Sequence, residues 1–234
     1  MKVLVGELST QIEYPDEDGK PMAEGDAQRE YLIYATKVLR IYFQNRPDVY
    51  VSGNLFIYYE EGNPEAVVAP DVFVVFGVNN HVRCSYKTWQ EEDKTPDFVL
   101  EITSKTTRSK DQGAKKGIYA FLGVREYFQY DPTGDYLNPQ LQGLRLVEGN
   151  YFPMAATTVP DGSLSLFSEV LGLELRSCSG ELRFYDPATR QKLLSHEEEA
   201  AARLAAEQAL QEEELRKQRL AAKLRELNID PDTV

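Results

Sequence analysis

The stretch from Pro96 to Pro132, PDFVLEITSKTTRSKDQGAKKGIYAFLGVREYFQYDP, constrains the fold more than any other part of the chain. It opens with an apolar run in which Glu101 is flanked by Phe98–Leu100 and Ile102. A helical pattern follows from about Ser109, and a second apolar strand ends the stretch. A carboxylate inside a buried strand is costly unless something compensates its charge. The pattern therefore predicts a strand, helix and strand built around a buried acidic group that has a partner.

The segment that links this strand to the helix is basic. Between Ser104 and Lys116 it carries five lysine or arginine residues and one acidic residue, Asp111, in a chain whose formal net charge is -12. Binding of nucleic-acid phosphates is driven by clustered Lys and Arg, so any such contact must be local to this segment. A solvated loop followed by a charged helix face is the alternative interpretation.

The remaining elements predict an α/β domain with a mixed sheet over residues 1–189. The apolar run at 66–78 has the composition of a central strand buried on both faces, and Gly-punctuated segments at 136–187 suggest hairpins that extend the same domain. Further expected elements are a helix from Asp26 to Phe43 and a pair of neighbouring strands at 49–53 and 54–60.

The C-terminal part, residues 190–234, differs in composition. From Arg190 to Leu227 it is rich in Glu, Ala and Leu and has neither Gly nor Pro, which predicts one long helix. Leu193, Leu204 and Leu215 recur every eleven residues, a spacing that favours a nearly straight or right-handed coil if it is sustained. The helix either forms a coiled coil or packs on its own domain and stays partly solvated.

Cysteine usage and hydropathy bear on the compartment. Cys84 and Cys178 are far apart and have no metal-type spacing, which favours a reducing compartment and predicts a cytoplasmic protein. No apolar run approaches the ~18 residues that a membrane span needs, so no membrane association is expected. The chain has two histidines, His81 and His196, and no glycine-rich phosphate loop, which argues against His-based catalysis and P-loop chemistry.

Asp71 and Glu101 are the candidates for chemistry, because each lies in a predicted buried strand. If both lie at a shared end of neighbouring strands, their oxygens can bind a hard divalent cation such as Mg²⁺. The alternative is that backbone donors or a lysine satisfy each of them structurally. Lys115, on one helical face with Asp111 and Tyr119, either reaches Glu101 and positions a water or forms a surface ion pair with Asp111.

Three motifs, APDVFVVFG, PDFVLEITSKTT and DQGAKKGIYAFLGVREYFQYDP, resemble the Uma-type "putative restriction endonuclease" family, a bacterial branch of the PD-(D/E)xK nuclease superfamily. The resemblance covers roughly residues 20–187. It implies a restriction-endonuclease-like fold, in which helices flank a mixed β-sheet core. It also implies hydrolysis of DNA phosphodiester bonds that depends on Mg²⁺, with Mn²⁺ as a possible substitute.

By position, the resemblance implies that Asp71 is the acidic residue of the PD element and that Glu101 is the next one. Thr103 stands where the superfamily expects a lysine, and in this family the lysine comes from the following helix, here Lys115. Asp71, Glu101 and the backbone carbonyl of Ile102 would hold the metal, and Lys115 would orient the attacking water.

The resemblance also implies supporting residues. Gln28 falls where many relatives carry a histidine and would assist the site through its amide. Lys105, Arg108 and Lys110 would contact the phosphate backbone without reading sequence. Relatives often have Ser-Pro where this chain has Ser104–Lys105, a departure in the loop after Glu101.

Three functions follow from these observations. The first is a metal-dependent DNA endonuclease that acts as a homodimer, since two sites are the simplest way to cut two strands. The second is a catalytically inactive DNA-binding or regulatory protein that keeps the nuclease fold. The third is an assembly protein in which the long helix is the working part.

Overall fold

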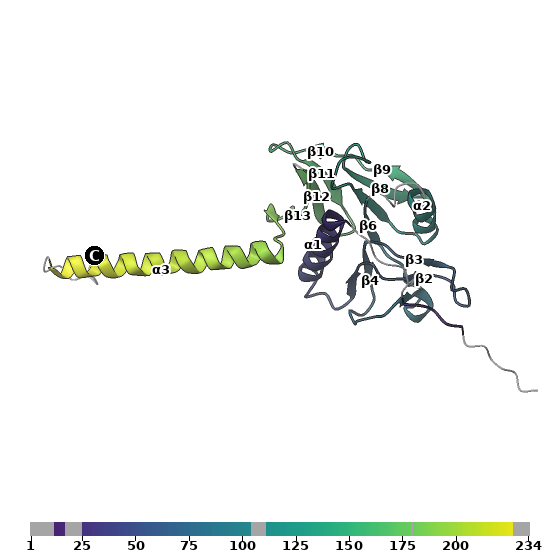
Figure 1. Ribbon diagram of the computed structural model, residues 1–234, viewed down its shortest axis with the longest axis horizontal. Coiled ribbons are helices and arrows are strands. Elements are labelled where there is room, and N and C mark those ends of the chain that lie inside the picture. Colours follow the sequence, from purple (N-terminus) through teal and green to yellow (C-terminus); the bar gives the residue numbers. More distant parts are fainter. Residues whose placement is uncertain (1–11, 17–24, 104–110, 179, 227–234) are drawn as a thin grey trace, which may run out of the picture. The chain divides into compact units, whose positions relative to one another are not determined.

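The computed structural model describes residues 12–16, 25–103, 111–178 and 180–226 (Figure 1). The chain divides into two compact units, residues 1–193 and 194–234. Within the described ranges, no helix combines the length and the apolar character that crossing a membrane requires.

The first unit contains two α-helices, a short 3₁₀ helix and all the strands that the structure describes. Their bounds are α1 (Asp26–Tyr42), β1 (Val49–Ser52), β2 (Ile57–Tyr58), β3 (Val67–Val68), β4 (Val72–Phe76), β5 (Tyr86–Lys87), η1 (Thr88–Gln90), β6 (Phe98–Ile102), α2 (Asp111–Phe121), β7 (Glu126–Tyr130), β8 (Leu141–Val147), β9 (Asn150–Pro153), β10 (Thr157–Thr158), β11 (Leu164–Ser168), β12 (Leu173–Cys178), β13 (Glu181–Asp186) and β14 (Gln191–Lys192).

The central sheet is mixed, in the order β1-β4-β6-β7-β8-β9. β6 and β7 are parallel, and the other neighbours are antiparallel. Parallel neighbours need a crossover connection, which α2 provides here. The predicted strand, helix and strand of 96–132 is this β6-α2-β7 unit, and the chain has the mixed α/β fold expected for a restriction-endonuclease-like core.

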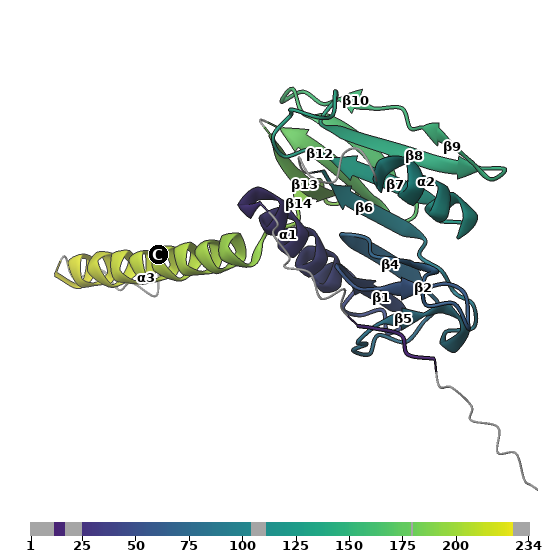
Figure 2. The ribbon, with the colours of Figure 1, turned by 45° about the vertical axis from the view of Figure 1, so that its right-hand side comes forward.

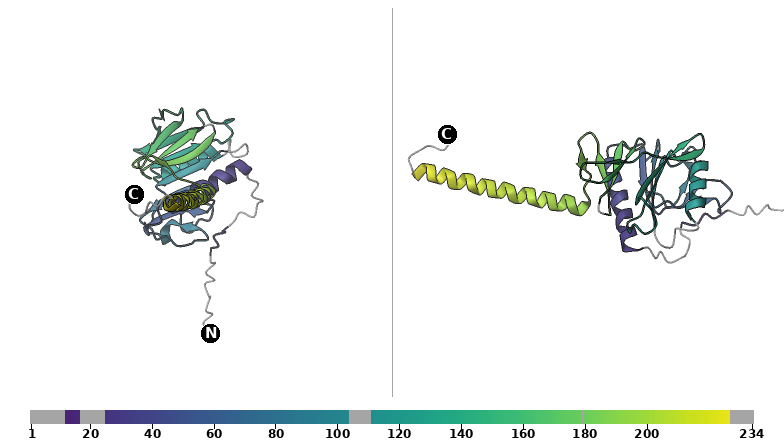
Figure 3. Two further views of the ribbon diagram at one scale, coloured as in Figure 1. Left: turned by 90° about the vertical axis from the view of Figure 1, so that its left-hand side faces the viewer. Right: turned by 90° about the horizontal axis from the view of Figure 1, so that it is seen from above.

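The two faces of the central sheet carry different partners. In β6, Phe98, Leu100 and Ile102 pack with α1 and the second sheet, whereas Val99 packs with Tyr119 of α2. Successive strand residues point to opposite faces, so Glu101 shares the α2 face with Val99. Figure 3 (right) shows α1 and α2 on opposite sides of the strands.

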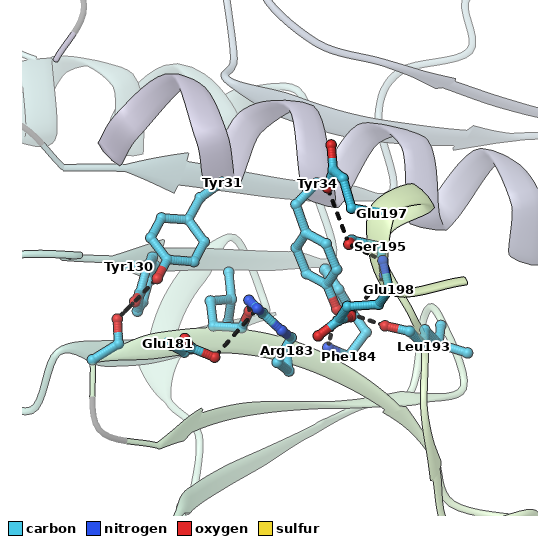
Figure 4. Close-up of polar contacts among 12 residues, drawn as sticks. Tyr31, Tyr34, Tyr130, Glu181, Arg183, Phe184, Leu193, Ser195, Glu197 and Glu198 are labelled. Carbon is cyan, nitrogen blue, oxygen red and sulfur yellow. Dashed lines mark hydrogen bonds and ion pairs between the residues drawn. The ribbon is translucent and has the colours of Figure 1, made fainter. Parts of the chain in front are cut away.

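A second, antiparallel sheet in the order β10-β11-β12-β13-β14 covers the α1 side. Tyr34 of α1 connects the two layers (Figure 4): its hydroxyl accepts the Phe184 N–H at 3.1 Å and donates to the Leu193 carbonyl at 3.0 Å. The Tyr31 hydroxyl donates to the Gly180 carbonyl at 3.1 Å. These bonds hold α1 against the second sheet, and α1 also contacts β1 and β4 of the first (Figure 2).

Three sequence expectations need correction. The strands expected at 49–53 and 54–60 do not pair with each other, because β1 pairs with β4 whereas β2 pairs with β3 and β5. The run 66–78 is two strands in different sheets, β3 and β4. Pro70 lies between them and has no N–H to donate to a ladder, which accounts for the break.

The third correction concerns the long helix, which starts at His196 and not at Arg190, since Gln191 and Lys192 pair with β13. The helix is α3 (His196–Glu226) and belongs to the second unit. Ser195 and Glu198 form a capping box at its start: the Glu198 N–H donates to Ser195 Oγ at 3.2 Å, and the Ser195 N–H donates to Glu198 Oε2 at 2.9 Å.

Candidate active site

Asp71, the residue directly before β4, lies opposite Glu101 of the neighbouring strand β6. Val72 of β4 pairs with Leu100 of β6 in an antiparallel register, so one step further along each strand places Asp71 across from Glu101. Phe73 and Val99, two residues away from each of them, both pack on the α2 face. Two carboxylates in such a cross-strand pair repel each other, so the arrangement needs positive charge nearby.

Asp71 is only 7% exposed, and its Oδ2 accepts the Ile102 N–H at 2.6 Å. Burial, followed by the negative charge of Glu101, raises the pKa of Asp71 well above its ordinary value. The Ile102 N–H and Lys115 act in the opposite direction and do not overcome this effect. In the metal-free protein, Asp71 therefore holds a proton at pH values where an ordinary aspartate has lost it.

Lys115 supplies the nearest positive charge. Its ammonium donates to both carboxylate oxygens of Glu101, at 3.1 and 3.2 Å, and to the Ala69 carbonyl at 3.2 Å. The two side chains are 21% and 11% exposed, so the ion pair is largely removed from solvent. Helix α2 thus places its lysine on the carboxylate of β6. The structure brings Asp71, Glu101 and Lys115 together in one cluster.

Tyr119 is a fourth member that the sequence did not assign to the site. Its hydroxyl donates to Glu101 Oε1 at 2.5 Å, and burial together with the charge of Glu101 raises the pKa of Tyr119 well above the ordinary value. The hydroxyl consequently remains a donor at physiological pH. The signal was present, because Tyr119 follows Lys115 by four residues and so lies on the same helical face.

Gly53 fixes the backbone beside Asp71. A Cβ at this position would lie 2.2 Å from the Asp71 carbonyl oxygen, a distance that no side chain tolerates. The next residue, Asn54, donates its N–H to the Pro70 carbonyl at 3.0 Å. The loop after β1 therefore holds the Pro70–Asp71 step in place, and only glycine permits this close approach.

Gln28 is a predicted site residue that the structure does not join to this cluster. Gln28 is buried in α1, which packs on the opposite face of the sheet, and among the described residues no hydrogen bond links it to Asp71 or Glu101. Lys105, Arg108 and Lys110 lie outside the described residues, and so does the side chain of Asp111. Their assigned roles stay predictions.

The donor set fits a hard divalent cation. Within the described part of the chain, no group of three or more His, Cys, Asp or Glu side chains is suited to a metal. Mg²⁺ does not require such a group, because it commonly uses one or two carboxylates and takes its other ligands from water and phosphate. When both Asp71 and Glu101 are ionised, two carboxylates face one ammonium, so negative charge is available for a cation. The Ile102 N–H points to Asp71. Because the carbonyl of a strand residue points to the same side as its N–H, the Ile102 carbonyl also points to the side of Asp71.

Comparison with known proteins gives structural neighbours and one family. One of the neighbours is the crystal structure of a "putative nuclease belonging to DUF820" from Anabaena variabilis, with a TM-score of 0.41 and 16% identity over 60% of this chain and 75% of that one. Likeness at this level supports no argument about the site. A search of curated proteins found no significant match. The family model Uma2, described as "Putative restriction endonuclease", matches residues 7–177, most of the first unit. The chain therefore belongs to the Uma2 family.

Proposed function

We propose that this protein is a Mg²⁺-dependent DNA endonuclease that hydrolyses phosphodiester bonds and accepts Mn²⁺ in place of Mg²⁺. The observation that supports the proposal is the buried cross-strand pair of Asp71 and Glu101, with the Lys115 ammonium on Glu101 at 3.1 Å. Two apposed carboxylates and one lysine are a costly arrangement for a purely structural role. The family description agrees with the proposal.

In this proposal, Asp71, Glu101 and the Ile102 carbonyl hold the metal ion. When bound, the ion supplies Lewis-acid stabilisation of negative charge on the scissile phosphate. Lys115 is kept in place by Glu101 and by the Ala69 carbonyl, and it donates a hydrogen bond that orients the attacking water. Tyr119 positions Glu101, since its hydroxyl is buried and bonded to Oε1.

The remaining residues have supporting roles in the proposal. Lys105, Arg108 and Lys110 contact phosphates outside the scissile bond, and Gln28 assists the site. The enzyme acts as a homodimer on DNA. The exposed thiol of Cys84 supports a reducing, cytoplasmic location.

A plasmid cleavage assay tests the proposal. We expect native protein to nick or linearise plasmid with Mg²⁺ or Mn²⁺ and not with EDTA, and Glu101→Gln to lose the activity. Glu65→Gln, an exposed glutamate of the same unit, is the matched control and should cleave normally. Equal cleavage by the native and Glu101→Gln proteins, or by neither, would contradict the assignment.

A second measurement separates cleavage from binding. Without DNA, Mg²⁺ should raise the melting temperature of the native protein and leave that of Glu101→Gln unchanged, because a ligand stabilises only the state that binds it. If the protein binds DNA but neither cleaves it nor responds to Mg²⁺, it is the inactive DNA-binding or regulatory protein. If it shows none of these activities, the assembly function gains support.

A further inference from the structure

Helix α3 has no buried residue, and most of its surface is exposed to solvent. Its 31 residues span about 46 Å, and the structure describes all of them and finds none buried. Four leucines along it are more than half exposed: Leu204, Leu210, Leu215 and Leu220. Helices in proteins gain most of their stability from packing, and intrahelical pairs such as Lys217–Glu213 at 2.8 Å add only a few tenths of a kcal/mol.

The charges of α3 are divided between its two halves. Residues 196–214 carry seven glutamates and one arginine, a net charge of -6, and residues 215–226 carry five basic residues and one glutamate, a net charge of +4. The helix dipole favours such charges only in the first and last turns. It does not account for Glu212–Glu214, which lie near the middle of the helix. A partner with the opposite order of charges would account for them.

One stripe of α3 has the spacing of a coiled-coil seam. Its members alternate at four and three residues, as heptad a and d positions do, and most are apolar. They are Ala206, Leu210, Glu213, Lys217, Leu220 and Leu224. Leu204 and Leu215, the members of the eleven-residue repeat within α3, lie off this stripe.

The two charged members of the seam discriminate between orientations. In a parallel, in-register pair, Glu213 would face Glu213 and Lys217 would face Lys217. In an antiparallel pair centred on Leu215, Glu213 of each copy faces Lys217 of the other copy, which gives two opposite-charge pairs. Leu210 of each copy faces Leu220 of the other. The same register places Ala206 against Leu224 and the acidic half beside the basic half. Polar residues at core positions are an established way to fix register and orientation.

We propose that two copies of this protein associate through an antiparallel pairing of their α3 helices along the seam Ala206, Leu210, Glu213, Lys217, Leu220 and Leu224. The pairing places the -6 half of each helix against the +4 half of the other and covers Leu210, Leu220 and Leu224. It does not rest on the nuclease assignment.

The mass of the full-length protein in solution tests the interface. We expect native protein to be a dimer by light scattering. Lys217→Glu places glutamate against glutamate at both central layers of the seam, and it should raise the dimer dissociation constant at least about tenfold. The double variant Glu213→Lys, Lys217→Glu restores the opposite-charge pairs and the dimer. Arg219→Glu makes the same change of charge off the seam and stays dimeric. A monomeric native protein, or a Lys217→Glu protein that dimerises as the native one does, overturns the proposal.

Cysteine cross-linking tests the orientation, in a background where Ser replaces Cys84 and Cys178. A mixture of Leu210→Cys and Leu220→Cys proteins forms a mixed disulfide dimer. Leu210→Cys alone does not, because its two thiols lie ten residues, about 15 Å, apart along the axis, beyond the reach of a disulfide. Cross-linking of Leu210→Cys alone, or none in the mixture, overturns the antiparallel register. Neither readout depends on DNA cleavage, so each fails or succeeds independently of the nuclease.

Discussion

Replacing Asp71 by asparagine should stabilise the metal-free protein near neutral pH. The pKa of Asp71 is raised by burial and by Glu101, so the folded protein binds a proton that the unfolded chain has already released. Where the folded state binds more protons, stability falls as pH rises, from the unfolded pKa near 4 up through the raised pKa. Asparagine carries no charge at any of these pH values and still offers an oxygen to the Ile102 N–H.

The size of the effect follows from the geometry. Facing residues on neighbouring strands have Cβ atoms about 5 Å apart. Above the raised pKa, where Asp71 and Glu101 are both ionised, two like charges at that distance repel by about 3 kcal/mol at an effective dielectric constant of 20. Asparagine loses the attraction of Lys115 and is a weaker acceptor for Ile102, which costs about 1 kcal/mol. The net gain is on the order of 1–2 kcal/mol. For a domain of this size it corresponds to a rise in melting temperature of about 2–8 °C.

Thermal unfolding in EDTA, followed by circular dichroism from about pH 4.5 to pH 8.5, measures the effect. Asp71→Asn should melt above the native protein at the alkaline end, and the difference should shrink towards pH 4.5, where the native carboxyl is also neutral. Asp135→Asn removes an exposed carboxylate and serves as the control. An Asp71→Asn protein that is no more stable than the native protein at pH 8.5, or whose gain in stability is independent of pH, would refute the predicted repulsion between Asp71 and Glu101.

Three further substitutions probe the same cluster. Lys115→Met leaves Glu101 without its cation and should lower the free energy of unfolding by roughly 3 kcal/mol, measured by urea titration without metal. An unchanged free energy of unfolding would mean that the ion pair at 3.1 Å contributes nothing to stability. Tyr119→Phe removes the hydrogen-bond donor to Glu101, so we expect the free energy of unfolding to fall by about 1.5–3 kcal/mol in the same titration and plasmid cleavage to slow. Native stability and native cleavage would exclude a positioning role for Tyr119. Gly53→Ala forces a Cβ to within 2.2 Å of the Asp71 carbonyl oxygen, so it should lower the free energy of unfolding by about 1–3 kcal/mol or more and reduce cleavage. A native melting temperature would show that the loop after β1 can move away from Asp71.

Much of the framework followed from local patterns. The apolar run that contains Glu101, the helix with Lys115 and Tyr119 on one face, and the following strand appear as β6, α2 and β7. These elements can be predicted from the sequence because hydrophobic periodicity and helix propensity act over a few residues. The same is true of α3, whose composition favours a helix even though its start at His196 depends on the Ser195 cap and the pairing of Gln191.

The pairing of the strands could not be predicted from the sequence. The run 66–78 has the composition of one strand, yet β3 and β4 belong to different sheets. β1 pairs with β4 and not with β2, the next strand in the sequence. Composition determines that a segment prefers a buried sheet, whereas partner choice depends on how all segments pack at once. The contact that Gly53 makes with Asp71 belongs to this second category.

The sequence alone determined that Asp71 and Glu101 would be costly to bury, because two carboxylates within apolar strands need compensation wherever the strands go. Only the tertiary structure decided that the compensation is shared. The antiparallel register of β4 and β6 sets the two carboxylates opposite each other, and the crossover through α2 brings Lys115 and Tyr119 to Glu101. Charge is a property of each residue, but the distances that give a cluster its chemistry are set by strand register and helix packing.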